Sequence, residues 1–312
     1  MPSETSTHVV FLGFGAVGRH LARLLRPELE DDRIRLTAAV RDLSRHEDSP
    51  ESGGVQLVQI DTPGLETAID SAEIVVEAAG VAPASTYGPR LIAAGQDVVL
   101  TSVGALADAE IASDLLAGPG RLWVTHGAIG GLDMLSSLAE AEGLDRVEIT
   151  TSTPPRGLIQ PWMDEDQQSR LEQLGADHQP LTVFSGSPRE ALDAFPDNAH
   201  VGVALAWATR GLSESPEQNV HLMQASLDRV ELTLVADPGL RDARHDITAS
   251  GSAGRFNFTF EAAPSPENPH TSITTALSVA HTLRQVLERL GRRKPPTARK
   301  SRTRMRTWED QA

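Results

Sequence analysis

The chain is an acidic body followed by a short basic end. It has 312 residues, no cysteine, and 28 basic against 43 acidic residues, which gives a formal net charge of −15. Residues 291–312 carry +6, so residues 1–290 carry −21, and no lysine precedes Lys294. This composition excludes disulfides, thiolate–metal sites and a lysine nucleophile in the body, and it predicts no nucleic-acid binding, because phosphate contacts need Lys or Arg. Without a long apolar window or a signal peptide, we expect a cytoplasmic protein with no membrane partner.

Short apolar runs alternate with helical spacing in the first half of the chain. We predict helices over 20–29, 89–94 and 108–116, and strands over 8–12, 35–40, 55–60, 74–78, 97–100 and 122–124. Buried strands that alternate with helices are typical of a doubly wound parallel sheet. We therefore expect an α/β protein whose first domain, residues 1–125, has the Rossmann arrangement.

The pattern changes after residue 125. We predict strands over 147–152, 181–184, 228–236, 246–250 and 255–262, several of which alternate apolar and polar residues. Such alternation indicates a sheet with one covered face, so we expect a second α/β domain with a mixed sheet over 126–270. Residues 271–290 have one long helical pattern that ends at Gly291, and the basic residues 291–312 lack any apolar period, which predicts disorder.

A glycine-rich turn follows the first predicted strand and opens the first helix. It reads Gly13-Phe14-Gly15-Ala16-Val17-Gly18. In the dinucleotide fingerprint, the first glycine permits the tight turn, the second lets the backbone approach the pyrophosphate, and the third lets helix and strand pack closely. We therefore predict cofactor binding by Gly13, Gly15, Ala16, Val17 and Gly18, with a glycine turn that binds no ligand as the alternative.

The end of the second strand governs the choice of cofactor. An acidic residue there binds the ribose of NAD, whereas an arginine accepts the 2′-phosphate of NADP. This chain has Arg41 at that point, with Ser44 and Arg45 nearby as possible anion donors and with Asp42 between them. The pattern favours NADP and leaves NAD open, and the alternative is that these are solvated loop charges.

Several motifs of the chain resemble the L-aspartate dehydrogenase family, which is similar in architecture to homoserine dehydrogenase. They are Ser102–Asp108, His126–Asp133, Phe195–Val201, Ala236-Asp237-Pro238 followed by His245, and Glu267–Ser272. The resemblance implies a Rossmann domain and a substrate domain that also forms a homodimer interface. It further implies that the helix at 271–290 returns to the first domain.

The resemblance also implies an activity. The family oxidises L-aspartate with NAD or NADP to iminosuccinate, which either hydrolyses to oxaloacetate and ammonia or supplies NAD biosynthesis. The catalytic histidine of the family corresponds to His245, and the cofactor contacts correspond to the glycine turn, Ala128 and the region of Asn198 and His200. Ala79, after the fourth predicted strand, is a further predicted cofactor contact.

The chemistry of this reaction suits residues in the second half. The substrate amine must lose a proton and water must later add to the imine, and a histidine with a pKa near 7 serves both steps. Two substrate carboxylates need cations or N–H donors, which without lysine must come from arginine, hydroxyl, imidazole or backbone groups. We predict substrate contacts for His200, Asn268, Thr271 and Ser272, the last three just before and at the start of a helix, where capping is the alternative.

Four positions near the predicted site depart from the family pattern. Thr153 stands where the family has lysine and Ala243 where it has asparagine, while His126 and His200 replace residues that are usually serine and asparagine. Two other hypotheses therefore stay open. One is a dehydrogenase or imine reductase of the same fold that acts on another small amino or keto acid, and the other is a non-catalytic NAD(P)-binding protein.

Overall fold

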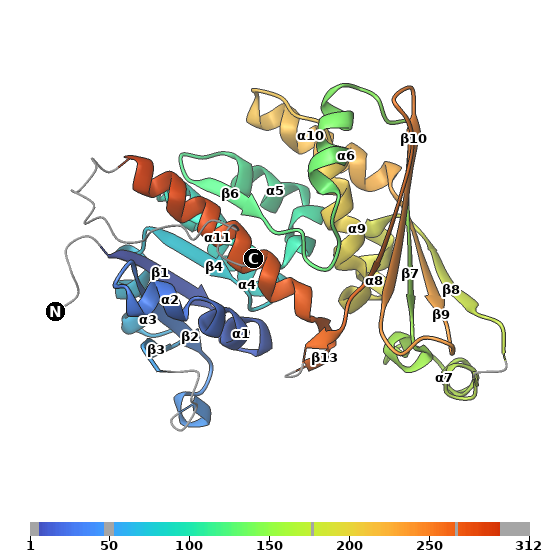
Figure 1. Ribbon diagram of the computed structural model, residues 1–312, viewed down its shortest axis with the longest axis horizontal. Coiled ribbons are helices and arrows are strands. Elements are labelled where there is room, and N and C mark those ends of the chain that lie inside the picture. The colour runs from blue at the N-terminus through green and yellow to red at the C-terminus, as the bar shows by residue number, and fades with distance from the viewer. Residues whose placement is uncertain (1–5, 47–52, 176–177, 266–267, 294–312) are drawn as a thin grey trace, which may run out of the picture.

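The computed structural model describes residues 6–46, 53–175, 178–265 and 268–293, and two large sheets organise it (Figure 1). The first is a six-stranded parallel sheet in the order β3-β2-β1-β4-β5-β6. Its strands are β1 (Thr7–Leu12), β2 (Ile34–Val40), β3 (Val55–Gln59), β4 (Ile74–Glu77), β5 (Asp97–Leu100) and β6 (Arg121–Val124). Every residue of β1, β4 and β5 is buried, as expected for a parallel sheet covered on both faces.

Helices cover both faces of this sheet because alternate strand residues enter two separate cores. Val10 and Leu12 pack with α3 (Pro63–Asp70), α4 (Val81–Ala93) and α5 (Ala109–Leu116). Val9 and Phe11 pack with α1 (Ala16–Leu24) and with α11 (Ile273–Arg293), the last described helix. The short helix α2 (Arg26–Glu30) follows α1, and Arg284 of α11 donates to its Glu28 at 2.8 Å.

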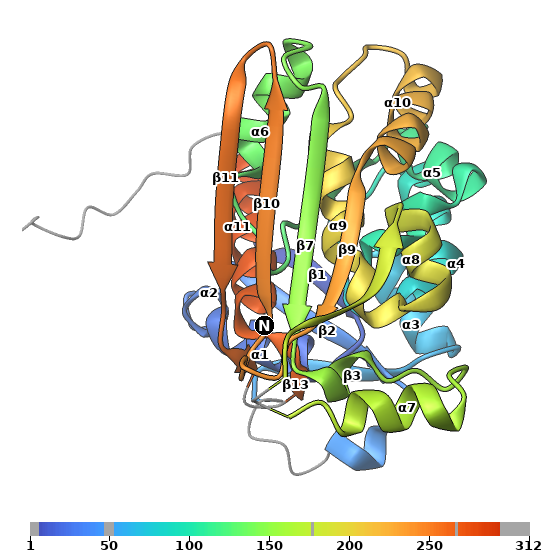
Figure 2. The same ribbon diagram turned by 90° about the vertical axis from the view of Figure 1, so that its right-hand side faces the viewer.

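The second sheet is mixed, in the order β11-β10-β7-β9-β8. Only β7 and β9 pair in parallel. The strands are β7 (Arg146–Thr153), β8 (Leu181–Gly186), β9 (Glu231–Ala236), β10 (Arg244–Gly251) and β11 (Gly254–Glu261). The helices α8 (Pro188–Ala194) and α9 (Pro196–Thr209) pack on one face, and α6 (Leu132–Glu140) and α10 (Pro216–Arg229) pack on α9. Figure 2 shows the other face without a helix over it, and α7 (Glu165–Glu172) lies at its lower end.

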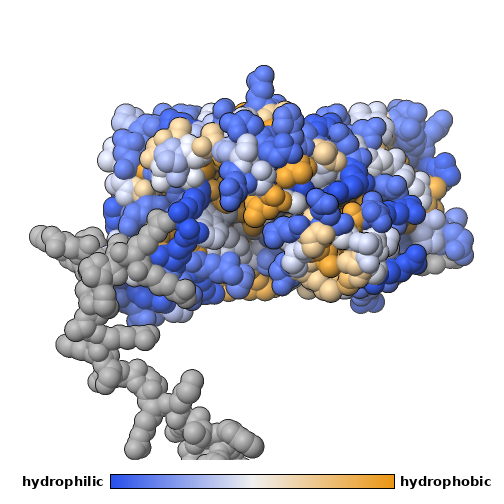
Figure 3. Space-filling view, turned by 90° about the horizontal axis from the view of Figure 1, so that it is seen from above, coloured by the Kyte–Doolittle hydropathy of each residue, from blue (hydrophilic) through white to orange (hydrophobic). Residues whose placement is uncertain are grey.

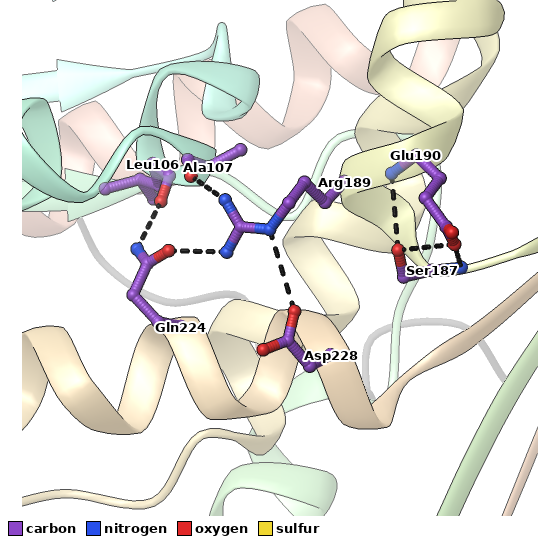
Figure 4. A network of polar contacts seen from close by, with 7 residues as sticks. All are labelled: Leu106, Ala107, Ser187, Arg189, Glu190, Gln224 and Asp228. Carbon is purple, nitrogen blue, oxygen red and sulfur yellow. Dashed lines mark hydrogen bonds and ion pairs between the residues drawn. The ribbon is translucent and has the colours of Figure 1, made fainter.

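A polar network joins the second sheet's helices to the first sheet (Figure 4). Arg189 of α8 donates to the carbonyl of Ala107 and to the side chain of Gln224 on α10, and it pairs with Asp228 at 3.6 Å. Gln224 in turn donates to the carbonyl of Leu106. Both carbonyls belong to the short helix η3 (Val103–Ala107), which follows β5, so the two halves are fixed to each other beside the carboxyl edge of the parallel sheet.

The outer surface is mostly polar. The face in Figure 3 is largely hydrophilic, with a group of apolar residues near its centre. Large hydrophobic side chains that are exposed among the described residues are Leu43, Val81, Met134, Trp162, Leu212 and Leu277. In the same part of the chain, no helix combines the length and the apolar character that a membrane crossing requires.

Several predicted boundaries were wrong. The helix α10 runs to Arg229, since Met223 and Leu227 bury its apolar side, so the strand starts at Glu231 and not at 228. Thr271 and Ser272 belong to β13 (Asn268–Ser272), which pairs with β12 (Pro264–Ser265), and the helix starts at Ile273. That helix passes Gly291, which has no positive φ and makes no cap, and ends at Arg293. The disorder predicted for residues 291–312 therefore fails for its first three residues, and the rest lies outside the described residues.

Candidate active site

A cavity of about 880 Å³ lies between the two sheets. One side comes from the segments that follow β4, β5 and β6, and the other from the ends of β7 and β10, the start of α9 and the strand β13. Ligands of open α/β sheets bind at this carboxyl edge. Eight predicted site residues line the cavity: Val17, Ala128, Asn198, His200, His245, Asn268, Thr271 and Ser272.

The glycine turn lies between β1 and α1, beside this cavity. Gly13 has φ +98°, and a Cβ there would lie 2.7 Å from the carbonyl oxygen of Ala78. A Cβ on Gly18 would lie 2.7 Å from the carbonyl oxygen of Gly13, whereas one on Gly15 would meet no protein atom within 4 Å. Two glycines are thus required by packing, and Gly15 leaves space above the N-terminus of α1, whose first N–H groups suit an anion. A dinucleotide pyrophosphate fits this turn.

A buried carboxylate shapes the neighbouring wall of the cavity. Glu77, the last residue of β4, accepts backbone N–H bonds from Ala79, Gly80 and Ser102 at 2.7, 3.0 and 2.9 Å. It also accepts the hydroxyl of Ser102 at 3.0 Å, and burial raises its pKa. The N–H of Ala79, a predicted cofactor contact, is therefore engaged by Glu77, and its neighbours Ala78 and Gly80 line the cavity. Sequence reasoning missed Glu77.

The turn at His126–Gly131 is held from both sides. The backbone N–H groups of His126 and Gly127 donate to the hydroxyl of Ser278 on α11 at 2.9 and 3.1 Å. The ring of His126 bonds the carbonyl of Ile129 at 2.9 Å, and burial lowers its pKa. Gly131 has φ +69°, and a Cβ there would lie 2.7 Å from the ring of Phe258 on β11. These contacts place Ala128 on the cavity wall.

His245 lies inside β10, which starts at Arg244 and not at 246 as predicted. It pairs with Thr151 of β7 in the sheet, and the ring Nδ1 lies 3.0 Å from the Thr151 hydroxyl. Burial lowers the pKa of His245 to about 4, partly offset by Asp246. The ring is therefore neutral at pH 7, and the pKa near 7 expected from the sequence was wrong. Because Nδ1 is engaged, Nε2 is the nitrogen left for a ligand.

The first turn of α9 carries two unsatisfied polar atoms. Asn198 Oδ1 and His200 Nδ1 are buried without a hydrogen-bond partner among the described residues. Burial lowers the pKa of His200, against an opposing effect of Asp197. Buried polar atoms are rarely left unpaired in a folded protein, so two of them at a cavity fit a bound polar ligand.

The three predicted contacts near β13 make local bonds. Asn268 donates to the hydroxyl of Thr271 at 3.0 Å. The hydroxyl of Ser272 accepts the backbone N–H of Thr274 at 3.2 Å in the first turn of α11. Ser272 thus makes the helix-capping bond that was predicted as the alternative to substrate binding. Asn268, Thr271 and Ser272 nevertheless all line the cavity.

Arg41 follows β2 directly and is exposed. Asp42 accepts the backbone N–H and the hydroxyl of Ser44 at 3.1 and 2.7 Å, and it pairs with Arg45 at 3.5 Å. Ser44 and Arg45, which the sequence offered as anion donors, are therefore already engaged by Asp42. Arg41 has no ion pair among the described residues.

Sequence reasoning missed two cations that line the cavity. Arg156 lies in the short helix η4 (Pro155–Leu158) after β7, and Arg241 precedes β10. Thr153 and Ala243, the two small residues that replace family residues, line the same cavity. The sequence around Arg156 and Arg241 does not indicate that either side chain lines a cavity. The two come close together only because β7 pairs with β10.

Comparison with known proteins identifies the family. The profile described as aspartate dehydrogenase, C-terminal, matches residues 133–286, and the NAD binding domain of homoserine dehydrogenase matches residues 13–118. The L-aspartate dehydrogenase of Ruegeria pomeroyi is 34% identical over 91% of this chain and 94% of its own. The chain belongs to the L-aspartate dehydrogenase family. The enzyme of that name from Brucella anthropi is 33% identical over 90% of this chain and 96% of its own.

Solved structures agree on the fold of this family. Aspartate dehydrogenase from Thermotoga maritima has a TM-score of 0.58 at 24% identity and covers 91% of this chain and 96% of its own. A hyperthermophilic archaeal homoserine dehydrogenase, solved with NADPH, has a TM-score of 0.53 at 11% identity over 91% of this chain and 98% of its own. The predicted family and the α/β class with a parallel and a mixed sheet are thus confirmed.

Proposed function

We propose that this protein is an NAD(P)-dependent oxidoreductase that oxidises L-aspartate to iminosuccinate, which hydrolyses to oxaloacetate and ammonia, or that runs the reverse reaction. One observation carries the proposal. A neutral, buried His245 opens onto the same cavity as Val17 and Ala128, in a chain that matches L-aspartate dehydrogenases along nearly their whole length. Family membership makes NAD or NADP the cofactor.

His245 provides the proton transfers of this reaction. Its neutral Nε2 accepts a proton from the substrate ammonium group, which leaves the amine lone pair free to form the C=N bond as hydride departs from the α-carbon. NAD(P)⁺, when bound, accepts that hydride. Thr151 engages Nδ1, so Nε2 is the ring nitrogen that remains available to a substrate in the cavity that His245 lines. His245 then releases this proton to solvent, and its neutral Nε2 takes a proton from the water that adds to the imine carbon. The resulting carbinolamine releases ammonia when its nitrogen takes that proton back from His245.

We propose that NADP is preferred over NAD, with Gly13, Gly15, Ala16, Val17 and Gly18 at the pyrophosphate. Arg41 supports the preference, because it is exposed at the end of β2 and Asp42 is engaged by its own loop. We assign Ala79, Ala128 and Asn198 to the cofactor side of the cavity. We assign His200, Asn268, Thr271 and Ser272 to the substrate side.

We propose a cytoplasmic homodimer in which residues 1–125 bind cofactor, residues 126–270 bind substrate and pair the subunits, and the helix α11 returns to the first part. The uncovered face of the second sheet supports this interface, since it is five strands wide and available to a second copy. Iminosuccinate from the reaction would be available to NAD biosynthesis. Light scattering of the purified protein checks the dimer, and a Thr248→Arg change on the uncovered face should shift it to monomer.

A spectrophotometric panel tests the proposed function. The protein is assayed with NAD⁺ and NADP⁺ against L-aspartate and other small amino acids, and in reverse with oxaloacetate plus ammonia. The proposal expects the highest kcat/KM for L-aspartate. Turnover of another amino or keto acid alone would favour the second hypothesis, which the departures at Thr153 and Ala243 keep open. Cofactor binding without any turnover would favour a non-catalytic protein.

A further inference from the structure

Besides its histidines, the cavity has four charged lining residues among those that the structure describes. They are Arg156, Arg241, Asp197 and Asp242. A substrate with two carboxylates needs cations, and a charge-assisted arginine–carboxylate contact is stronger and more directional than a neutral hydrogen bond. The two arginines are therefore the groups to examine for substrate recognition.

Strand pairing brings both arginines to the His245 end of the second sheet. In the antiparallel pair, His245 lies opposite Thr151 and Arg244 lies opposite Ser152. The chain continues from β7 through Thr153 into η4, and it enters β10 from the segment 241–243. Thr153 and Ala243, at the edge of this pair, are short and line the cavity. The longer side chains just beyond them are those that can extend over the substrate.

The surroundings distinguish the two arginines. Arg241 precedes Asp242, whose carboxylate also lines the cavity and reduces the positive charge there. Arg156 has no acidic neighbour in its turn, which reads Pro155-Arg156-Gly157-Leu158. Its carbonyl accepts the backbone N–H of Ile159, but its side chain makes no hydrogen bond or ion pair with the described residues. The turn lies against the cavity wall, since a Cβ on Gly157 would be 3.2 Å from the Thr153 hydroxyl.

We propose that Arg156 binds the side-chain carboxylate of the substrate and determines the preference for a dicarboxylic amino acid. The inference rests on the proposed function. The α-carboxylate shares a carbon with the departing hydride and the amine, so it must lie beside His245. The exposed guanidinium of Arg156, five positions beyond Thr151 on the cavity rim, suits the more distant carboxylate, and among the described residues it has no partner to give up.

The test compares L-aspartate with L-asparagine, which has the same shape without the side-chain charge. In Arg156→Gln, we expect the KM for L-aspartate to rise about 10- to 100-fold with little change in kcat, as for the loss of one charge-assisted bond. The ratio of kcat/KM for L-aspartate over L-asparagine should fall at least about tenfold. Arg156→Lys should keep much of this ratio, because it keeps the charge. Arg170→Gln, on the adjacent exposed helix α7 and outside the cavity, is the matched control and should leave it unchanged.

Three results would overturn the inference. They are an unchanged KM in Arg156→Gln, an equal loss on both substrates, and loss of discrimination in Arg241→Gln in place of Arg156→Gln. A calorimetric titration of the NADPH-loaded protein with succinate tests the site without turnover, and Arg156→Gln should weaken succinate binding about tenfold or more. If the wild type binds succinate through Arg156 but does not turn over L-aspartate, the proposed function fails and the carboxylate site stands.

Discussion

His245 and Thr151 form a buried pair in which one hydroxyl fixes the orientation of the ring (Nδ1 to hydroxyl, 3.0 Å). For Nε2 to accept a proton, Nδ1 must carry the hydrogen and donate it to Thr151. Thr151→Val removes this acceptor without changing the size of the side chain. We expect kcat to fall about tenfold, the value of one net hydrogen bond, with cofactor affinity unchanged.

The conservative variant distinguishes orientation from packing. Thr151→Ser keeps the hydroxyl, so its kcat should stay within about threefold of wild type. Stopped-flow and steady-state rates over pH 6–9 measure both variants. A Thr151→Ser enzyme as slow as Thr151→Val would show that the methyl group, and not the hydrogen bond, is what matters.

Arg41 governs the choice between the two cofactors in our proposal. Arg41→Ala should raise the KM for NADP⁺ about 10- to 100-fold, because a charge-assisted bond to the 2′-phosphate is lost, and should leave the KM for NAD⁺ within about threefold. Arg45→Ala is the control, since Arg45 is paired with Asp42. Equal effects of Arg41→Ala on the KM values of both cofactors would show that Arg41 does not contact the 2′-phosphate.

The residues that the sequence could indicate are those in local motifs. The glycine turn, Ala128 and His245 stand in short patterns that a single chain displays. Thr151, Glu77 and Arg156 do not, because their positions depend on which strands pair and on which loops meet after folding. Burial also changed the expected chemistry of His245, since its depth in β10 could not be read from its neighbours in the sequence.

At the scale of elements, two glycines of the glycine turn have different roles: Gly18 is needed for packing, whereas Gly15 leaves space for the cofactor. Gly15→Ala adds a methyl group where no protein atom lies within 4 Å, so the folded protein should keep its stability while the Kd for NADPH rises tenfold or more. Fluorescence titration of NADPH and thermal unfolding measure the two effects. Tight cofactor binding by Gly15→Ala would place the pyrophosphate elsewhere.

Gly18→Ala is the matched change within the same turn. Its methyl group would lie 2.7 Å from the carbonyl oxygen of Gly13, so the variant should lose about 1–3 kcal/mol of unfolding free energy. Urea unfolding of the ligand-free protein measures this loss. Equal stability of Gly18→Ala and Gly15→Ala would mean that the turn relaxes without cost.

The strands of the two large sheets were predictable to within three residues because buried apolar runs have sharp ends. The helices α3, α6, α8, α9 and α10 were not predicted. The helix α9 is buried on most sides, with Ala199, Val203 and Leu205 all inaccessible, so it lacks the polar stripe that marks a surface helix. The last two residues of β13, Thr271 and Ser272, were taken for the start of α11, since only the pairing of β13 with β12 distinguishes the two.

For the whole molecule, buried neutral histidines make stability depend on pH. The folded pKa of His245 is about 4, below the ordinary value of 6.5, so the unfolded chain binds more protons between these values and stability falls as the pH falls from 6.5 towards 4. This one group should cost about 2 kcal/mol between pH 7.5 and pH 5. Burial lowers the pKa of His8, His126 and His200 as well, which adds to the loss in the same direction.

Urea unfolding of wild type and His245→Asn at pH 7.5 and pH 5 measures this dependence. The variant lacks the titrating ring and should lose less stability on acidification than the wild type, by about 2 kcal/mol. The same pH dependence in both proteins would mean that His245 is protonated in the folded state at pH 5.

The central claim is that one cavity, with His245 as its proton acceptor, oxidises L-aspartate. The most direct test is the initial rate of NAD(P)H formation from saturating L-aspartate by wild type and His245→Ala, with Kd for NADPH measured on both. We expect turnover by the wild type, a loss of about 10²- to 10⁴-fold in the variant, and equal cofactor affinity. Equal rates in the two proteins, or no oxidation of L-aspartate by the wild type, would contradict it.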